Sequence, residues 1–285
     1  MTVLRLPRGA KIKTFPLPPA GFNPLTADAA MLRRFGLPQR PAGPPALIAR
    51  WEKAVGRPRR FIEPTFRRVE GMRHRPRLRR LREGADTSDN WSGAVVFAPG
   101  GSTFTLVSAH WSVPIPNPAS PDATPFASSC WIGIDGDGSN DVFQAGAECD
   151  AVNLGIAVAR TISLWWEWFP DSAVEITNLP ASAGDQLSCS LSVTSSTTGM
   201  VSFSNQTTGT ATNFEVTAPA GTTLTGNSAE WIVERPEING AISKLANYGE
   251  VDFTNCFAVT SAASQVLPPS GNTIAMNEDG FIVSK

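Results

Sequence analysis

The stretch WIGIDGDGSNDVFQAG, residues 131–146, alternates apolar and polar side chains on both sides of a turn rich in Gly, Asp and Asn. Because side chains on a strand switch faces at every residue, this pattern predicts an antiparallel hairpin. One face holds Trp131, Asp135 and Gln144, whereas the isoleucines of the stretch lie on the other. The hairpin therefore predicts a sheet with an apolar core face and a polar, aromatic face.

Two other stretches repeat this arrangement. The sequence AEWIVE, residues 229–234, directs Glu230 away from its core-facing side chains. In ISLWWEWFPD, residues 162–171, Trp165 and Glu167 share the face opposite the apolar one. A carboxamide, carboxylates and tryptophans are thus predicted to gather on one surface of a β-sheet.

Almost every segment after residue 90 alternates with period two, as in LSCSLSV at residues 187–193. Short strands separated by Gly, Asn, Pro and Ser turns predict an all-β fold, an antiparallel β-sandwich of two sheets. Composition and charge change near residues 84–89. We therefore expect two parts, a basic segment at 1–88 and a sandwich domain at 89–285.

Charge divides the chain in the same place. Residues 1–85 hold 20 of the 24 Lys and Arg but only five acidic residues, a net charge of +15. The other 200 residues hold four bases and 20 acids, a net charge of −16. Because opposite charges within one chain lie close to each other, this split favours intramolecular binding over a nucleic-acid partner. The basic segment is predicted to bind the acidic domain.

The basic segment is rich in proline and mostly lacks periodicity, which predicts an extended, largely irregular conformation. A short amphipathic helix is predicted between residues 45 and 56, where apolar side chains recur at helical spacing. The arginine-rich run at 57–82 is typical of a solvated, easily cut segment. Cleavage of the chain is therefore expected near residues 82–90.

All four cysteines lie in the acidic part, and none has the CxxC spacing of a zinc site. An even number of cysteines on strands favours disulfides. Cys130 and Cys149 are equidistant from the predicted turn, so antiparallel pairing would place them opposite each other. This pairing leaves Cys189 with Cys256, and the alternative is four reduced thiols in the core.

The sequence does not predict a membrane partner or a visible route of export. No stretch approaches the ~20 apolar residues that a membrane span needs. The start of the sequence carries charge but lacks the apolar core of an ordinary signal peptide.

Nucleophilic and zinc-dependent hydrolysis are poorly supported by the residues present. The two histidines, His74 and His110, do not lie beside a Ser or Cys nucleophile motif. An acidic loop with Asp135, Asp137 and Asp141 resembles a turn more than a calcium site, because the EF-hand spacing does not fit. No metal or cofactor is predicted.

Carboxylates and one carboxamide remain as candidate catalytic groups. A glycosidase needs two carboxyls ~5 Å apart or ~6.5 to 9.5 Å apart. Glu230 and Glu234 lie about 13 Å apart along a strand, so a partner such as Glu167 or Asp135 would be required. A peptidase would use one glutamate as general base on a water molecule and the Gln144 amide as a donor to the oxyanion. An ordinary Glu, with a pKa of ~4.3, suits such work in an acidic medium.

Six motifs in order carry a resemblance to a known family. They are NWSG (90–93), WIGIDGDG (131–138), FQAG (143–146), WWEWFPD (165–171), AEWIVE (229–234) and YGEVDFTN (248–255). Together they cover roughly residues 90–258 and resemble the glutamic peptidases, or eqolisins. This resemblance implies a sandwich of two sheets of about seven strands each, secretion, an acid optimum and polypeptide substrates.

The resemblance also implies a catalytic dyad of Gln144 and Glu230. Glu230 would activate the water and later protonate the leaving nitrogen, and Gln144 would orient the water and hold the oxyanion. Four further residues match positions that line the substrate cleft of the family, namely Trp131, Asp135, Trp165 and Glu167. The basic segment resembles the prosegments of prokaryotic members.

The predicted function is an acid-acting endopeptidase, made as a monomeric zymogen whose prosegment is an intramolecular inhibitor. Two alternatives stand beside it. A carbohydrate-binding sandwich would use exposed tryptophans as sugar platforms. A glycosidase would use two of the carboxylates on the same face.

Overall fold

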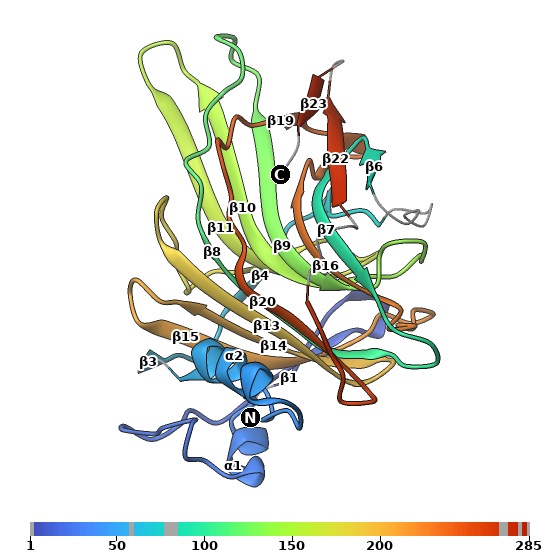
Figure 1. Ribbon diagram of the computed structural model, residues 1–285. Coiled ribbons are helices and arrows are strands. Elements are labelled where there is room, and N and C mark those ends of the chain that lie inside the picture. The colour runs from blue at the N-terminus through green and yellow to red at the C-terminus, as the bar shows by residue number, and fades with distance from the viewer. Residues whose placement is uncertain (1–2, 57–59, 77–84, 268–272, 279–280, 284–285) are drawn as a thin grey trace.

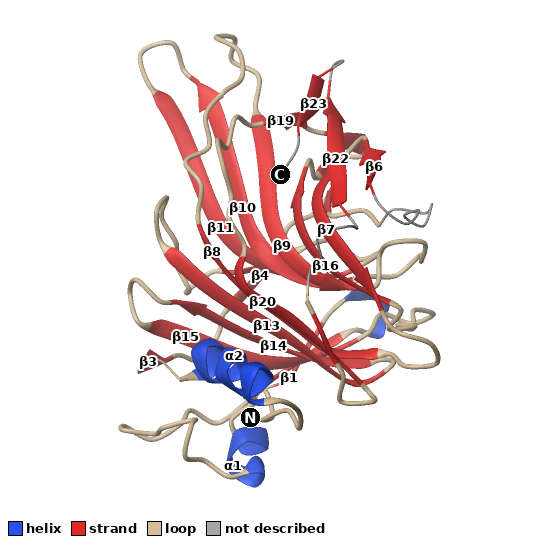
Figure 2. Ribbon diagram, viewed as in Figure 1, coloured by secondary structure: helices blue, strands red, loops and turns tan. Residues whose placement is uncertain are grey.

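Two largely antiparallel sheets pack face to face in the computed structural model (Figures 1 and 2), as the period-two pattern predicts. The structure describes residues 3–56, 60–76, 85–267, 273–278 and 281–283. The predicted all-β sandwich is confirmed. Each strand places one set of alternating side chains between the sheets, which is how a sandwich forms its core.

The first sheet has nine strands within the described residues, in the order β1-β2-β15-β14-β13-β8-β20-β21, with β3 beside β15. Their bounds are β1 Val3–Arg5, β2 Lys11–Thr14, β3 Arg60–Phe61, β8 Phe104–Ser112, β13 Gln186–Ser195, β14 Thr198–Asn205, β15 Thr210–Thr217, β20 Thr254–Thr260 and β21 Gln265–Val266. Three of these strands, β1 to β3, belong to the N-terminal segment 1–88 and extend the sheet at β15.

The second sheet has eleven strands within the described residues, in the order β23-β22-β7-β16-β9-β10-β11-β12-β4, with β19 beside β9 and β6 beside β22. Their bounds are β4 Phe66–Arg68, β6 Ala85–Ser88, β7 Trp91–Phe97, β9 Phe126–Ile134, β10 Phe143–Asn153, β11 Val158–Trp168, β12 Val174–Ile176, β16 Ser228–Glu234, β19 Lys244–Leu245, β22 Thr273–Glu278 and β23 Phe281–Val283. A small third sheet joins β5 Met72–Arg73, β17 Glu237–Ile238 and β18 Ala241–Ile242.

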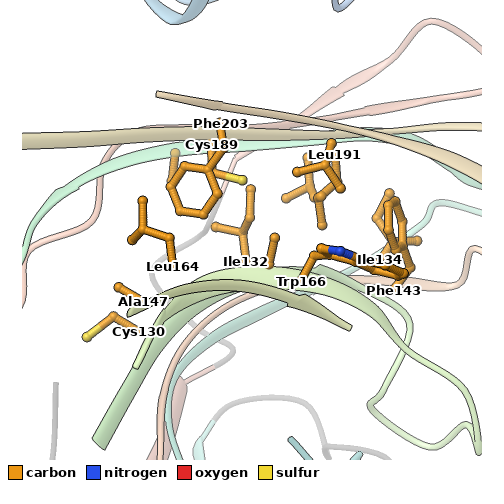
Figure 3. Packing of buried hydrophobic residues seen from close by; sticks show 14 of the residues in the cluster. Cys130, Ile132, Ile134, Phe143, Ala147, Leu164, Trp166, Cys189, Leu191 and Phe203 are labelled. Atoms are coloured by element: carbon orange, nitrogen blue, oxygen red, sulfur yellow. The ribbon is translucent and has the colours of Figure 1, made fainter. Parts of the chain in front are cut away.

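The main core lies between the two large sheets. Figure 3 shows Cys189, Leu191 and Phe203 of the first sheet facing Ile132, Leu164 and other side chains of the second. Trp231 of β16 also lies in this core, and its indole N–H donates to the carbonyl oxygen of Ser108. The apolar face predicted from the alternation is therefore the face that closes the sandwich.

The N-terminal segment covers the outer faces of both sheets. Helix α2, Pro45–Val55, confirms the predicted amphipathic helix, and it packs with the shorter α1, Ala29–Arg34, against the first sheet (Figure 1). The segment also contributes strands that the largely irregular prediction lacked. These strands add to exposed sheet edges through main-chain hydrogen bonds, a kind of pairing that needs no apolar repeat in the sequence.

The predicted disulfides are not formed, because all four cysteines are buried free thiols. The strands pair Cys130 with Ala147 and Cys149 with Ser128, so the two cysteines lie diagonally rather than opposite each other. The predicted hairpin centre was off by one residue, and each residue of shift in the centre moves a pairing partner by two. Cys189 and Cys256 likewise do not form a disulfide with each other.

Candidate active site

Gly133 lies between Gln144 and Glu230 in one row of the second sheet. Gln144 on β10 and Glu230 on β16 are each directly opposite Gly133 on β9. Directly opposed residues of antiparallel strands point to the same face, and neighbouring strands are about 4.8 Å apart. The two side chains therefore rise from one face, with Cα atoms about 10 Å apart. Only a glycine stands between them.

Three more carboxyl groups lie on this polar face. Glu167 on β11 is directly opposite Gln144, and Glu148 lies four residues after Gln144 on the same strand. Glu234 lies four residues after Glu230 on β16. Even-numbered spacing on a strand keeps side chains on one face. The alternation that fills the core thus also collects the polar groups on the opposite side.

Residues 72–76 of the N-terminal segment, here called the strap, cross the polar face. The strap is held at β5, where Met72 and Arg73 pair with β17. Met72 packs against a small apolar cluster that includes Trp131 and Trp165, and His74 is fully buried. The strap therefore crosses the face that the sequence assigns to the site and packs on the cluster that holds Trp131 and Trp165.

The main chain of His74 is bound by Gln144 and Glu167. Nε2 of Gln144 donates to the carbonyl oxygen of His74 at 2.7 Å, and to Oε1 of Glu167 at 3.3 Å. The backbone N–H of His74 donates to both carboxyl oxygens of Glu167, at 3.2 and 3.1 Å. Both polar main-chain groups of this strap residue are thus bound by side chains of the sheet.

The imidazole of His74 lies between two carboxyl groups. Its Nδ1 is 3.1 Å from Oε2 of Glu167, and its Nε2 is 3.1 Å from Oε2 of Glu148. The ring stacks on the indole of Trp165, with centroids 3.5 Å apart and planes 2° from parallel. Trp165 is itself held by a hydrogen bond from its indole N–H to the hydroxyl of Ser129 at 3.0 Å.

Glu234 binds the next strap residue. Its Oε1 accepts the backbone N–H of Arg75 at 3.1 Å and the side-chain amide of Asn90 at 3.1 Å. Its Oε2 accepts the indole N–H of Trp131 at 2.7 Å. Consecutive residues of the strap, His74 and Arg75, are therefore held by two glutamates on different strands.

Glu230 differs from the other carboxyl groups in its contacts. It is fully buried, and neither of its carboxyl oxygens has a hydrogen-bond partner among the described residues. The same holds for Oε1 of Gln144. Buried polar atoms normally have partners, and unsatisfied ones are concentrated where a ligand or reactant binds. These three oxygen atoms are the unsatisfied polar groups of the row through Gly133.

Burial raises the pKa values of the acidic groups around the strap. It raises the pKa of Glu167 to about 7, against a lowering by His74, and that of Glu148 to about 7. Burial also raises the pKa of Glu234 and Glu230 well above the usual range, and for Glu230 the charges of Asp135 and Asp137 add to the effect. Burial therefore favours the protonated form of Glu230.

Asp135 anchors a neighbouring loop. Its carboxylate accepts the backbone N–H groups of Thr225, Gly226 and Asn227 at 2.6 to 2.9 Å, and also the hydroxyl of Thr225 at 3.0 Å. Burial raises the pKa of Asp135 despite these hydrogen bonds. In the same acidic turn, Asp141 accepts the backbone N–H of Thr223. The turn is thus fastened by protein donors.

The structure places five of the six residues that the sequence singles out on the polar face, with Trp131 and Trp165 buried beneath the strap. The sixth, Asp135, lies just after β9 and is directed to the loop at 225–227. The structure adds Glu148 and His74, and it gives contacts to Glu234, which the sequence suggested only as a glycosidase carboxyl. The period-two pattern could have found Glu148 and assigned it a role, since it follows Gln144 by four residues. His74 lies in an arginine-rich run without periodicity, so no local signal marks it.

The eight tryptophans of the chain are all buried. None of them presents an exposed ring to a sugar in this form of the protein. The described residues also contain no group of three or more His, Cys, Asp or Glu that could hold a metal ion. Within the same residues, no helix is both long and apolar enough to cross a membrane.

An all-β sandwich with glutamates and a glutamine on one sheet face is the architecture of a class of acid peptidases. Residues 89–285 match the model of the Peptidase A4 family, and the chain belongs to that family. It is a glutamic-type endopeptidase, an acid-acting enzyme that hydrolyses peptide bonds in polypeptides.

Two curated relatives support this assignment. The chain is 28% identical over 216 residues to aspergillopepsin-2 of Aspergillus niger, covering 70% of this chain and 73% of the relative. It is 29% identical over 207 residues to scytalidopepsin B of Scytalidium lignicola, covering 70% and 74%.

Solved structures agree. Scytalidoglutamic peptidase with a transition-state analogue inhibitor matches with a TM-score of 0.58 and 27% identity, covering 68% of this chain and 91% of that one. Aspergilloglutamic peptidase from Aspergillus niger matches with a TM-score of 0.50 and 30% identity, covering 55% and 90%. The structure of SCP-B, a member of the eqolisin family, in complex with the tripeptide Ala-Ile-His has a TM-score of 0.53 and 26% identity, covering 68% of this chain and 91% of that one.

Proposed function

We propose that Glu230 and Gln144 are the catalytic dyad of this endopeptidase. The observation that carries the proposal is their common row, in which both face Gly133 and both have unsatisfied oxygens. A water molecule bound between the two side chains could donate hydrogen bonds to the unsatisfied oxygens of Glu230 and Gln144. Trp131, Asp135, Trp165 and Glu167 would line the substrate cleft around this pair.

The reaction would proceed by general acid–base catalysis. Ionised Glu230 takes a proton from the water while the water oxygen attacks the peptide carbonyl carbon. The C=O electron pair moves to the carbonyl oxygen, and the Nε2 amide of Gln144 donates a hydrogen bond to that oxyanion. Glu230 then returns the proton to the amide nitrogen as the C–N bond breaks, which leaves a carboxyl and an amine product.

The contact between Gln144 and His74 supports the oxyanion role of the amide. Nε2 of Gln144 already donates to a main-chain carbonyl oxygen of the strap, that of His74, at 2.7 Å. A substrate carbonyl would take the same place once the strap leaves. The same contact supports a second proposal, that residues 1–88 are a prosegment and that the full chain is a zymogen.

The strap would keep the enzyme latent in two ways. It occupies the carbonyl-binding side of Gln144. We propose that it also keeps water away from Glu230, whose burial raises its pKa and favours its protonated form. A protonated carboxyl cannot accept the proton of the attacking water. Release of the strap would expose Glu230 to solvent, lower its pKa and restore the base.

Ion pairs tie the prosegment to the acidic domain. Arg75 and Arg73 both contact Glu237, at 2.9 and 3.6 Å, and Arg67 contacts Glu175. Lys13 contacts Glu215 at 3.2 Å. Strong acid would protonate these carboxylates and remove the attraction, and high salt would screen the exposed pairs. Processing is proposed near residues 82–90, a region of which 82–84 lie outside the described residues.

The dyad is tested by digestion of an unfolded protein at acidic pH with the wild-type chain, Glu230→Gln and Gln144→Ala. We expect each variant to lose roughly 10²- to 10⁴-fold in kcat/KM. Glu250→Gln, which changes an exposed carboxyl in a loop, is the matched control. Activity that survives both dyad changes would remove the proposed mechanism.

Latency is tested by measuring prosegment cleavage against pH and salt. We expect the wild-type chain to stay intact at neutral pH and to be cut after acidification, sooner when NaCl is raised to 1 M. A prosegment that remains bound and uncut under both low pH and high salt would contradict the electrostatic mechanism. Because the enzyme would be inert until acidified, we further propose that it is exported and works outside the cell as a monomer.

A further inference from the structure

We propose that the place occupied by the His74 imidazole is the specificity pocket for the substrate residue whose carbonyl is attacked, and that this pocket selects histidine. Trp165 forms its wall, and Glu148 and Glu167 lie at the two ends of the imidazole. The inference rests on the proposed function, because it uses Gln144 as the group that binds the reacting carbonyl.

The position of the pocket follows from the main chain of the strap. The carbonyl oxygen of His74 lies on Nε2 of Gln144, where the oxyanion would form. A substrate residue that places its carbonyl on this amide would direct its side chain as His74 does. Its N–H would meet Glu167, and the N–H of the following residue would meet Glu234, as the N–H groups of His74 and Arg75 do. The strap therefore marks the substrate residue on the amino side of the cleaved bond.

The chemistry of the pocket matches an imidazole on every side. Both ring nitrogens have a carboxyl oxygen at 3.1 Å, and the ring lies flat against the indole at 3.5 Å. An imidazolium has two N–H donors, one for each carboxyl, and a cationic ring on Trp gains further from the π system. A leucine or phenylalanine in this place would remove the two ring N–H donors that face these carboxyl oxygens.

Carboxyl groups surround the pocket. Asp150 lies two residues after Glu148 on β10. Burial and the charge of Glu148 raise the pKa of Asp150 to about 9, which keeps it a neutral acid, and its hydrogen bond to Glu148 lowers the pKa of that group. The charge of Glu234 on β16 raises the pKa of Glu167, and the charge of Glu148 raises the pKa of Glu234. Arg73 and Arg75, which pair with Glu237, belong to the strap and would leave with it. Release of the prosegment would thus leave a pocket lined by carboxyl groups that can accept the N–H groups of an imidazolium.

The test begins with the acid-activated wild-type chain and a mixture of unfolded proteins, with every cut mapped by mass spectrometry. We expect histidine to be enriched at the residue that precedes the cut. The best-cut sequence then supplies a pair of peptides that differ only in carrying His or Leu at that residue. We expect kcat/KM to favour the His peptide by about 10- to 100-fold, the range of one or two charge-assisted hydrogen bonds.

The carboxyl at the far end of the ring is tested with Glu148→Gln. This change should lower the His-to-Leu ratio of kcat/KM by about tenfold, because an amide replaces the carboxyl that faces Nε2 of the imidazole. Glu250→Gln, at an exposed carboxyl in a loop, should keep the wild-type ratio. The His-to-Leu ratio of kcat/KM measured with the wild-type enzyme tests the preference for histidine by itself. The test therefore holds even if Glu148→Gln fails to fold.

The possible failures are distinguishable. If neither peptide is cut and no protein is digested, the proposed peptidase mechanism fails. If both peptides are cut equally, the mechanism stands and the histidine pocket is wrong. A His preference that is unchanged in folded Glu148→Gln would also overturn the assignment, because other residues would then select the histidine side chain.

Discussion

The side-chain amide of Gln144 donates a 2.7 Å hydrogen bond to the main-chain carbonyl of His74, so one residue of the N-terminal segment occupies a binding group of the sheet. The two residues are 70 positions apart in the chain. His74 therefore binds the sheet both through its main-chain carbonyl and through the two carboxyls that contact its imidazole.

Replacing His74 with alanine should therefore weaken latency. The change leaves the buried carboxyls of Glu148 and Glu167 without their shared partner, and breaking a buried pair is strongly destabilising. After a shift from neutral to acidic pH, we expect activity to appear about tenfold faster or more than in the wild type. The measurement is the lag before a fluorogenic peptide is cut. His110→Ala, which removes the other histidine, is the control, and equal lags in all three proteins would argue against the strap.

The pH dependence of stability has a definite sign. Folding raises the pKa of Glu148 and Glu167 from 4.5 to about 7, so the folded chain binds more protons than the unfolded chain in that range. The unfolding free energy should therefore be highest at mildly acidic pH and fall as the pH rises through about 7. Each group contributes up to about 3 kcal/mol to this loss.

Thermal unfolding of the latent chain between pH 5 and pH 8 checks this expectation. The melting temperature should fall with rising pH, and Glu148→Gln, which cannot ionise, should flatten the decline. A melting temperature that rises over the same interval would contradict the assignment of these carboxyls as protonated. Acid-driven release must accordingly come from the ion pairs of the arginines, at a lower pH than the one that stabilises the buried carboxyls.

Gly133→Ala should impair catalysis. A Cβ atom at this position would lie 2.8 Å from Cζ3 of Trp131 and 3.3 Å from Oε2 of Glu230. The crowding would displace the proposed base, and a displacement of about 1 Å can cost roughly 100-fold in rate. We expect kcat/KM to fall by about 10- to 100-fold at acidic pH. Gly100→Ala is a suitable control, because nothing lies within 4 Å of the added methyl; equal activity of the two variants would contradict the crowding.

The four cysteines should behave as thiols. Burial raises the pKa of the Cys189 thiol. The pKa of the Cys149 thiol is also raised, mainly by its hydrogen bond with Cys130 and then by burial. Thiolates are the reactive form, so native protein should react slowly with an alkylating reagent. After unfolding without reductant, mass spectrometry should find four alkylated cysteines. Two or none would restore one or both of the disulfides that the sequence suggested.

The sequence by itself determined the sandwich and which side chains share a face. Alternation with period two is a local property of a strand, so Ile132 and Glu230 could be assigned to the core face and the polar face without knowing the neighbouring strands. The six ordered motifs then identified the family. The register between strands could not be predicted from alternation alone, because it depends on the exact position of the turn. A hairpin centre displaced by one residue moved Cys149 two positions away from Cys130.

Only the tertiary structure decided which strands are neighbours and what covers them. The meeting of Gln144 and Glu230 across Gly133 depends on β9 lying between β10 and β16, and β16 comes from a distant part of the chain. The place of His74 depends on long-range contacts made by a segment without periodicity, so its neighbours in the sequence carry no trace of them. A strand pattern records the side of the sheet on which a residue lies, whereas the partner across space is fixed by packing of the whole chain.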